Sequence, residues 1–303
     1  MPLHLDHRPK TLKKVVGQGA TVAALKAVLE RDDIPHAFLF HGPSGCGKTT
    51  LARIVAKKLG CSEMDIKELN VADVRGIDSV REISRTMMLR PMGGNARVWI
   101  LDEAHQLSKD AIAALLKPLE DCPDHVYFML CTTDPQKLIA TIRNRCSQFA
   151  LTLVSDEDLA DLLNAVAAKE GVEIPESVIN SIVSASGGSP RAALVHLDKV
   201  KDLPEDEMEK AVSRIDTNAS AAIDLCRALL KDKPNWSEIA KVLSNLSGGE
   251  PEQIRMAVLG YCNAILLKGK FNGRACLVME CFKDPFYNDG KFRLTLACAA
   301  SVA

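Results

Sequence analysis

One stretch, Gly42-Pro43-Ser44-Gly45-Cys46-Gly47-Lys48-Thr49, constrains the fold of this 303-residue chain more than any other. It matches G-x-x-x-x-G-K-[ST], a loop whose backbone N–H groups surround the phosphates of a nucleotide. An apolar run at 37–40 precedes it, and apolar residues at helical spacing follow at 50–59. These flanks predict a strand, a loop and a helix whose N-terminus points at the phosphates. A glycine-rich turn without a ligand is the weaker alternative.

The residue types within this stretch suit a nucleotide with its metal ion. The Lys48 ammonium is placed to reach the β- and γ-phosphates, and the Thr49 hydroxyl to bind Mg²⁺. The glycines let the backbone curl around the phosphates because no Cβ stands in the way. The predicted nucleotide contacts here are Gly42, Pro43, Ser44, Gly45, Cys46, Gly47, Lys48, Thr49 and Thr50.

Strands and helices alternate over the first half of the chain. Strands are predicted at 37–40, 66–71, 97–101 and 126–131. Helices are predicted at 21–30, 50–59, 77–88 and 109–119, and residues 2–19 are expected to be irregular. Such alternation predicts an α/β fold with a doubly wound parallel sheet.

The strand patterns stop after residue 153, and helical patterns follow. They cover 156–169, 176–185 and 190–200, and resume from 217. We therefore expect three parts: a nucleotide-binding α/β domain at 1–152, a small helical domain at 153–214 and a C-terminal helical domain at 215–303. Charge follows this division, since residues 1–152 carry a net charge of +4 and residues 153–212 one of −8. A nucleic acid would meet the first part and avoid the second.

Two adjacent acids end the apolar run at 97–101. In a P-loop fold that strand lies beside the strand leading into the loop, so Asp102 is expected to hold Mg²⁺ and Glu103 to polarise the attacking water. Acids that merely begin the next helix are the alternative. The letters from Asp102 to His105 also spell a helicase motif, but 153–303 offers no strands for the second ATPase-like domain of such helicases.

Further polar residues follow the next strand. Thr132 and Thr133 follow the run at 126–131, where a hydroxyl can orient water or sense a γ-phosphate, although a simple strand-to-turn transition is as common. Arg143 and Arg145 come shortly after, as surface charges or as an arginine offered to a neighbouring subunit's nucleotide. Arg191 begins a helix in the acidic part and could contact the γ-phosphate of its own chain.

Composition limits the class of protein. No run of eighteen apolar residues occurs, and the first ten residues lack the apolar segment of a signal peptide, so no membrane partner and a cytoplasmic location are expected. Ten cysteines are present without any C-x-x-C pair, which favours buried free thiols over disulfides or a zinc site.

Together these segments resemble the ATPase subunits of sliding-clamp loaders within the AAA+ superfamily. Arg8-Pro9-Lys10-Thr11-Leu12 and Val15-Val16-Gly17-Gln18 resemble the family's N-terminal segment. Residues 132–138 and 142–146 are similar to the bacterial polymerase III gamma/tau subunit, and 69–78 to the small subunits of replication factor C. The resemblance covers most of residues 7–200.

The resemblance implies roles for individual residues. Arg8, Pro9 and Val16 would lie against the adenine of ATP. Thr133 takes the sensor-1 position, and Arg191 the sensor-2 position. Arg145 would be the finger that acts on the neighbouring subunit's nucleotide, although Asn144 stands where the family has serine. His7 replaces a frequent aromatic residue, and the zinc module of the bacterial gamma subunit is absent, so no zinc is expected.

The resemblance also implies partners. Basic side chains that would face duplex phosphates, which fix position without reading sequence, are Arg75, Arg81, Lys117 and Lys137. The implied partners are a sliding clamp, primer–template DNA and other loader subunits in a ring, expected to be pentameric and either homo- or hetero-oligomeric. A C-terminal part of about ninety residues is compact for a collar, which indicates a streamlined or phage-encoded system.

The resulting interpretation is an ATP- and Mg²⁺-dependent clamp-loader subunit that opens a clamp and loads it on primed DNA. Two alternatives stay open. Another AAA+ nucleic-acid machine, such as a branch-migration helicase or a helicase loader, is one. A structural loader subunit without hydrolysis is the other, although such subunits usually lose the loop lysine or the strand-end glutamate, and both are present here.

Overall fold

The computed structural model describes most of the chain, in two compact units formed by Met1–Asp202 and Leu203–Ala303. The described residues are 1–71, 76–205, 207, 208, 211, 212, 223–231, 233–245, 251–267, 272–284, 286 and 290–302.

The first unit is built on a parallel sheet of five strands in the order β2-β3-β4-β1-β5. The strands are β1 (Ala37–His41), β2 (Cys61–Asn70), β3 (Ala96–Asp102), β4 (Val126–Thr132) and β5 (Ser147–Ala150). The three central strands are covered on both faces and are almost continuously apolar, as parallel sheets require. The carboxyl ends of β1, β3 and β4 meet at one edge of the sheet.

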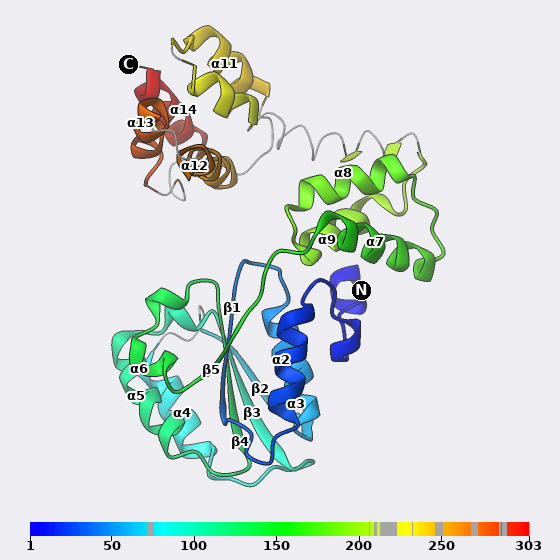
Figure 1. The fold of residues 1–303 in the computed structure, drawn as a ribbon, viewed down its shortest axis with the longest axis vertical. Helices are drawn as coiled ribbons and strands as arrows, with labels where there is room; N and C mark the ends of the chain where they lie inside the picture. Colours follow the sequence, from blue (N-terminus) through cyan, green and yellow to red (C-terminus); the bar gives the residue numbers. More distant parts are fainter. Residues whose placement is uncertain are drawn as a thin grey trace. The chain divides into compact units, whose positions relative to one another are not determined.

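Helices cover both faces of this sheet (Figure 1). Helices α2 (Gly19–Leu29) and α3 (Lys48–Lys58) cover one face, and α4 (Ile77–Thr86), α5 (Lys109–Glu120) and α6 (Ala140–Arg143) cover the other. Alternation along β1 supplies both cores, since Phe38 and Phe40 pack towards α2 and α3 while Leu39 packs on the opposite face. The predicted doubly wound α/β fold is confirmed.

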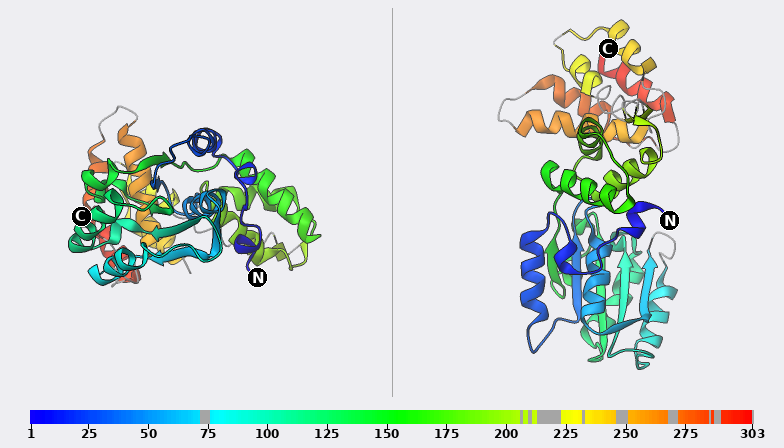
Figure 2. Two further views of the ribbon diagram at one scale, coloured as in Figure 1. Left: turned by 90° about the horizontal axis from the view of Figure 1, so that it is seen from below. Right: turned by 90° about the vertical axis from the view of Figure 1, so that its right-hand side faces the viewer.

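Three helices follow the sheet within the same unit: α7 (Asp156–Glu170), α8 (Glu176–Ser186) and α9 (Pro190–Val200). Ser155 caps α7 by accepting from the Asp158 N–H, and Ser189 caps α9 by accepting from the Ala192 N–H. The short helix α1 (Leu3–Asp6) packs against α9, which brings the N-terminal segment to this group (Figure 2). The remaining short elements are the 3-10 helices η1 (Leu12–Lys14), η2 (Ala104–Gln106) and η3 (Pro135–Lys137).

Three details differ from the sequence-based expectation. Strand β2 begins at Cys61 rather than at residue 66, with an irregularity between Cys61 and Ile66 in its pairing with β3. Strand β5 was not expected, because four residues with one buried side chain carry too little pattern without β1 beside them. Helix α1 lies in a stretch expected to be irregular, and its Leu3 is buried.

The second unit is helical in its described parts. Its helices include α11 (Trp236–Asn245), α12 (Pro251–Leu267), α13 (Gly273–Cys281) and α14 (Gly290–Val302), which share an apolar core around Val258 and Phe282. Within that core region, buried Arg255 is held by Glu252 and donates to the Phe282 carbonyl. Among the described residues, no helix has the length and apolar character needed to cross a membrane.

Candidate nucleotide-binding site

The glycine-rich loop joins β1 to α3, as its sequence predicts. Gly45 and Gly47 have φ values of 73° and 107°, which side-chain-bearing residues rarely adopt. A Cβ on Gly45 would lie 2.2 Å from Ser189 Oγ, at the start of α9. Glycine at this position therefore lets the loop approach α9 closely.

Lys48, the first residue of α3, is buried against the loop. Its Nζ donates to the carbonyl oxygens of Gly42 and Pro43, at 2.9 and 2.8 Å. Two neutral carbonyls satisfy part of the hydrogen-bonding capacity of an ammonium group, which has three donors. The lysine is thus held beside the loop with charge available for an anionic ligand.

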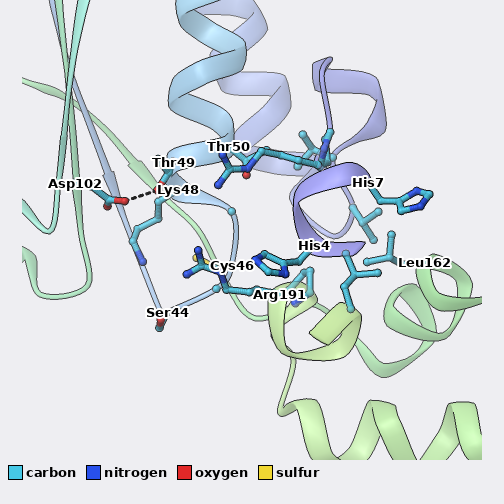
Figure 3. Close-up of a pocket in the computed structure, with 18 of the residues that line it drawn as sticks. His4, His7, Ser44, Cys46, Lys48, Thr49, Thr50, Asp102, Leu162 and Arg191 are labelled. Atoms are coloured by element: carbon cyan, nitrogen blue, oxygen red, sulfur yellow. Dashed lines mark hydrogen bonds between the residues drawn. The ribbon is translucent and has the colours of Figure 1, made fainter. Parts of the chain in front are cut away.

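Thr49 and Asp102 bring two oxygen ligands together. Thr49 Oγ1 donates to Asp102 Oδ2 at 2.8 Å, from the first turn of α3 to the end of β3 (Figure 3). Hydroxyl and carboxylate oxygens are the ligands that Mg²⁺ prefers, with substrate phosphates completing its coordination. These residues fit a magnesium ion bound with a nucleotide.

Glu103 follows directly and has an unusual backbone. Its φ is 51°, the one positive value among the described residues other than glycine. Asp102 Oδ1 accepts from the Glu103 N–H at 3.0 Å. The Glu103 side chain lines the same pocket as Lys48 and Thr49.

The end of β4 supplies the partners of Glu103. Thr133 Oγ1 donates to Glu103 Oε2 at 3.3 Å. Thr132 is instead fully buried, and its Oγ1 accepts from the Asp134 N–H at 3.0 Å. His105 Nδ1 lies 3.0 Å from Thr132 Oγ1 and 3.4 Å from Glu103 Oε2. Sequence reasoning gave His105 no role of its own, because its nearness to Thr132 arises only when β3 and β4 pair.

A pocket opens above the loop, between the sheet and helices α7 and α9. Arg191 reaches it from α9, with its guanidinium on the side of Cys46 (Figure 3). His4, His7 and Leu162 lie across the pocket from Asp102 in the same view. The lining residues are His4, His7, Arg8, Pro9, Val15, Val16, Ser44, Gly45, Cys46, Gly47, Lys48, Thr49, Thr50, Asp102, Glu103, Leu162, Pro190, Arg191 and Leu194.

The structure places the predicted site residues in three ways. Those that line the pocket are Arg8, Pro9, Val16, Ser44, Gly45, Cys46, Gly47, Lys48, Thr49, Thr50, Asp102, Glu103 and Arg191. Gly42 and Pro43 do not line it, and their carbonyls bond Lys48 from behind the loop. Thr133 reaches the site through Glu103 rather than through the pocket wall.

Charge in the pocket is mainly positive beside the N-terminal segment. Burial, and then the neighbouring charge of Arg53 and of Arg191, lowers the pKa of the Arg8 guanidinium. An anion in the pocket would relieve this repulsion. His7 Nε2 lies 2.7 Å from Glu170 Oε1, which ties the N-terminal segment to the end of α7 and lowers the pKa of Glu170.

Arg145 lies away from its own chain's pocket. Its Nη1 donates to the Thr141 carbonyl at 2.9 Å, and its Nη2 pairs with Glu120 at the end of α5. Arg143 donates to Gln136. Neither arginine lines the pocket that holds Lys48.

The residues expected to contact DNA are only partly described. Arg75 lies outside the described residues. Arg81 is exposed on α4 and pairs with Asp78 at 3.2 Å, and Lys117 is exposed on the neighbouring α5. Lys137 in η3 is 65% exposed and lies 3.5 Å from Asp134.

The cysteines form no disulfide in the structure, and most are buried. Burial raises the pKa of the Cys46 thiol in the loop and, more strongly, that of Cys131. In the part of the chain that the structure describes, no three His, Cys, Asp or Glu residues gather as a metal site.

Comparison with known proteins agrees with this geometry. The DNA polymerase III subunit gamma/tau of Mycobacterium tuberculosis H37Rv is 34% identical over 223 residues, covering 66% of this chain and 39% of that protein. The DNA polymerase III subunit tau of Bacillus subtilis is 30% identical over 290 residues, covering 88% of this chain and 51% of that protein. The chain is a homologue of the polymerase III gamma/tau subunits.

Two further comparisons found a matching family model and a solved structure of the same fold. A family described as DNA polymerase III, delta subunit, matches residues 65–155, from β2 to the residue that precedes α7. RuvB of Thermotoga maritima, a Holliday junction branch migration motor, has the same fold, with a TM-score of 0.56, 23% identity and coverage of 86% of this chain and 84% of that one. The resemblance to AAA+ clamp-loader ATPases expected from the sequence is therefore confirmed. The two gamma/tau matches cover 66% and 88% of this chain, whereas the chain spans only 39% and 51% of the length of these two relatives.

Proposed function

We propose that this gamma/tau homologue is an ATPase subunit of a sliding-clamp loader. ATP binding and hydrolysis would drive the opening of a clamp and its loading onto primer–template DNA. One observation carries the proposal: Lys48 and Thr49 of the loop meet Asp102 and Glu103 at the carboxyl edge of the sheet. The relatives' place in DNA polymerase III supplies the replication context.

The residues divide the work of hydrolysis. The Lys48 ammonium would bind phosphate oxygens, and Thr49 and Asp102 would hold the metal ion. Bound Mg²⁺ would neutralise charge that develops on the phosphates. Glu103 would orient and polarise the attacking water, and Thr133 would hold the Glu103 carboxylate through a hydrogen bond. Arg191 would contact the phosphates from α9 in the same chain.

Arg145 would act on the nucleotide of a neighbouring subunit. Its distance from its own pocket, and its exposed pairing with Glu120, support a role in trans. The arginine would add positive charge where the transferred phosphoryl group develops negative charge. Hydrolysis would then require assembled subunits, which we propose form a pentameric ring.

The remaining parts of the chain would organise partners. Arg81 and Lys117, on adjacent helices, would contact duplex phosphates together with Arg75 and Lys137. Helices of the segment 153–214 would act as a lid over the nucleotide, and the segment 215–303 as the collar joining subunits. We propose a cytoplasmic site of action, because loading requires access to replicating DNA.

ATP turnover by the 303-residue chain, assembled with its replication partners, tests this function. Turnover should be low alone and should rise when clamp and primed DNA are both present. Arg145→Ala should abolish the rise and leave ATP binding unchanged, while the control Arg143→Ala keeps it. Stimulation by DNA without any need for a clamp would favour a helicase, and stimulation that survives Arg145→Ala would refute the action in trans.

A further inference from the structure

We propose that His105 is a positioning residue for ATP hydrolysis, which acts by holding the carboxylate of Glu103. The inference rests on the proposed ATPase function and extends it to a side chain with no assigned role. His105 lies in η2, immediately after β3, and does not line the nucleotide pocket itself. It would therefore act through Glu103 and not on the nucleotide.

The imidazole is placed between two strand ends. His105 Nδ1 lies 3.0 Å from Thr132 Oγ1, on the buried last residue of β4, and 3.4 Å from Glu103 Oε2. With a proton on Nδ1, the ring donates to Thr132 Oγ1, and the same nitrogen lies within ion-pair distance of the Glu103 carboxylate. The His105 side chain is only 13% exposed, so its ring has little freedom to turn away.

Glu103 needs such support more than an ordinary glutamate does. Its φ of 51° places the backbone in a region that costs energy for any residue with a Cβ. The Asp102 carboxylate holds its N–H, and Thr133 donates to the same Oε2 that His105 approaches. Two side chains therefore converge on one carboxylate oxygen, which leaves Oε1 without a described hydrogen-bond partner and available to face the pocket.

This arrangement predicts a specific division of labour. Thr132, through its buried hydroxyl, holds the imidazole, and the imidazole with Thr133 holds Glu103. Because a small displacement of the group that orients water slows the chemical step, losing the imidazole should lower kcat. Nucleotide affinity should change little, since Lys48, Thr49 and Arg191 are untouched.

Three variants of His105 in the full chain test the inference, with steady-state ATP turnover under clamp and primed DNA as the readout. His105→Ala should lower kcat about tenfold or more, with KM for ATP within about twofold of wild type. His105→Asn should recover most of the rate, because its amide N–H can stand where Nδ1 stands. His105→Gln, whose amide reaches the position of Nε2, should recover little. His125→Ala is the matched control, since that ring contacts only the Leu89 carbonyl among described hydrogen bonds.

The outcomes separate this inference from the function on which it rests. If wild type turns over ATP and Glu103→Gln abolishes turnover, the ATPase function stands. The positioning role alone would then be overturned by any of three results. These are an unchanged kcat in His105→Ala, a rise in the KM of His105→Ala for ATP as large as its fall in kcat, or equal kcat values in the Asn and Gln variants. If wild type and Glu103→Gln show the same ATP turnover, the proposed ATPase function itself is refuted.

Discussion

Thr49 Oγ1 donates a 2.8 Å hydrogen bond to Asp102 Oδ2, joining the first turn of α3 to the end of β3. Thr49 follows β1 and Asp102 ends β3. The sequence-based expectation that these two strands are neighbours was wrong, because β4 lies between them in the sheet. This contact brings the proposed metal ligands together. The loop and the strand-end acids therefore form one site.

Removal of the Thr49 hydroxyl should weaken the binding of Mg²⁺ and so lower Mg²⁺-dependent ATP turnover. We expect Thr49→Ala to lower ATP turnover about a hundredfold, because one metal ligand and the contact to Asp102 are both lost. Thr49→Ser keeps the hydroxyl and should stay within a fewfold of wild type. Turnover measured against Mg²⁺ concentration, with chelator as the zero point, tests this. Equal magnesium dependence in the two variants would contradict the assignment.

Gly45→Ala should disturb the junction between the loop and α9. The new Cβ would lie 2.2 Å from Ser189 Oγ, which caps α9 by accepting from the Ala192 N–H. To relieve that overlap, Ser189 must move and lose its capping hydrogen bond, which destabilises α9 by about 1 kcal/mol. ATP affinity should then fall about tenfold. Gly187→Ala is the control, since Gly187 also has positive φ but nothing within 4 Å of an added Cβ. Comparable losses of affinity in both variants would point to backbone strain alone.

The Arg145–Glu120 pair should restrain the arginine without stabilising the fold. Its side chains are 32% and 48% exposed, and exposed pairs contribute only about 0–1 kcal/mol. Glu120→Gln should leave the melting temperature unchanged and raise clamp- and DNA-stimulated turnover about twofold, the equivalent of about 0.5 kcal/mol. Glu63→Gln, which removes an exposed partner of Lys57, is the control. A fall in turnover would show that Glu120 assists Arg145 instead of restraining it.

Acid should weaken the fold through Asp65, whose side chain is 1% exposed. Burial raises the pKa of this carboxyl, but hydrogen bonds from Ser62, the Met92 and Gly93 N–H groups and Arg97 outweigh it and bring the pKa to about 2. The folded pKa lies below the ordinary value of about 3.9, so the stabilisation is present above that pH and is lost as pH falls through about 2.

In Asp65→Asn, the free energy of unfolding should therefore fall less between about pH 4 and pH 2 than in wild type. The two falls should differ by roughly 2–3 kcal/mol. Urea unfolding of both proteins at several pH values in this window measures it. Parallel curves for the two proteins would mean that the carboxyl contributes nothing to the acid dependence.

Local patterns predicted the central strands because these carry unbroken apolar runs, and the bounds of α7 to α9 because clear capping residues flank them. Strand β5 escaped prediction because its four residues are defined by pairing with β1. The place of Thr132 and Thr133 after a strand predicted polar groups near the site, and the resemblance singled out Thr133, whereas the approach of His105 to Glu103 was not predicted. His105 follows Glu103 by two residues, and this spacing alone does not show that the two side chains lie 3.4 Å apart.

The sequence by itself determined the glycine-rich loop, the strand-end acids and the parallel α/β class, because each depends on residue types that lie close together in the chain. Only the tertiary structure decided which of these groups meet. Pairing of β3 and β4 placed Thr133 beside Glu103 and Thr132 beside His105, and the docking of α9 on Gly45 placed Arg191 over the loop. Such contacts depend on the register of strands and the packing of helices, which distant parts of the chain set together.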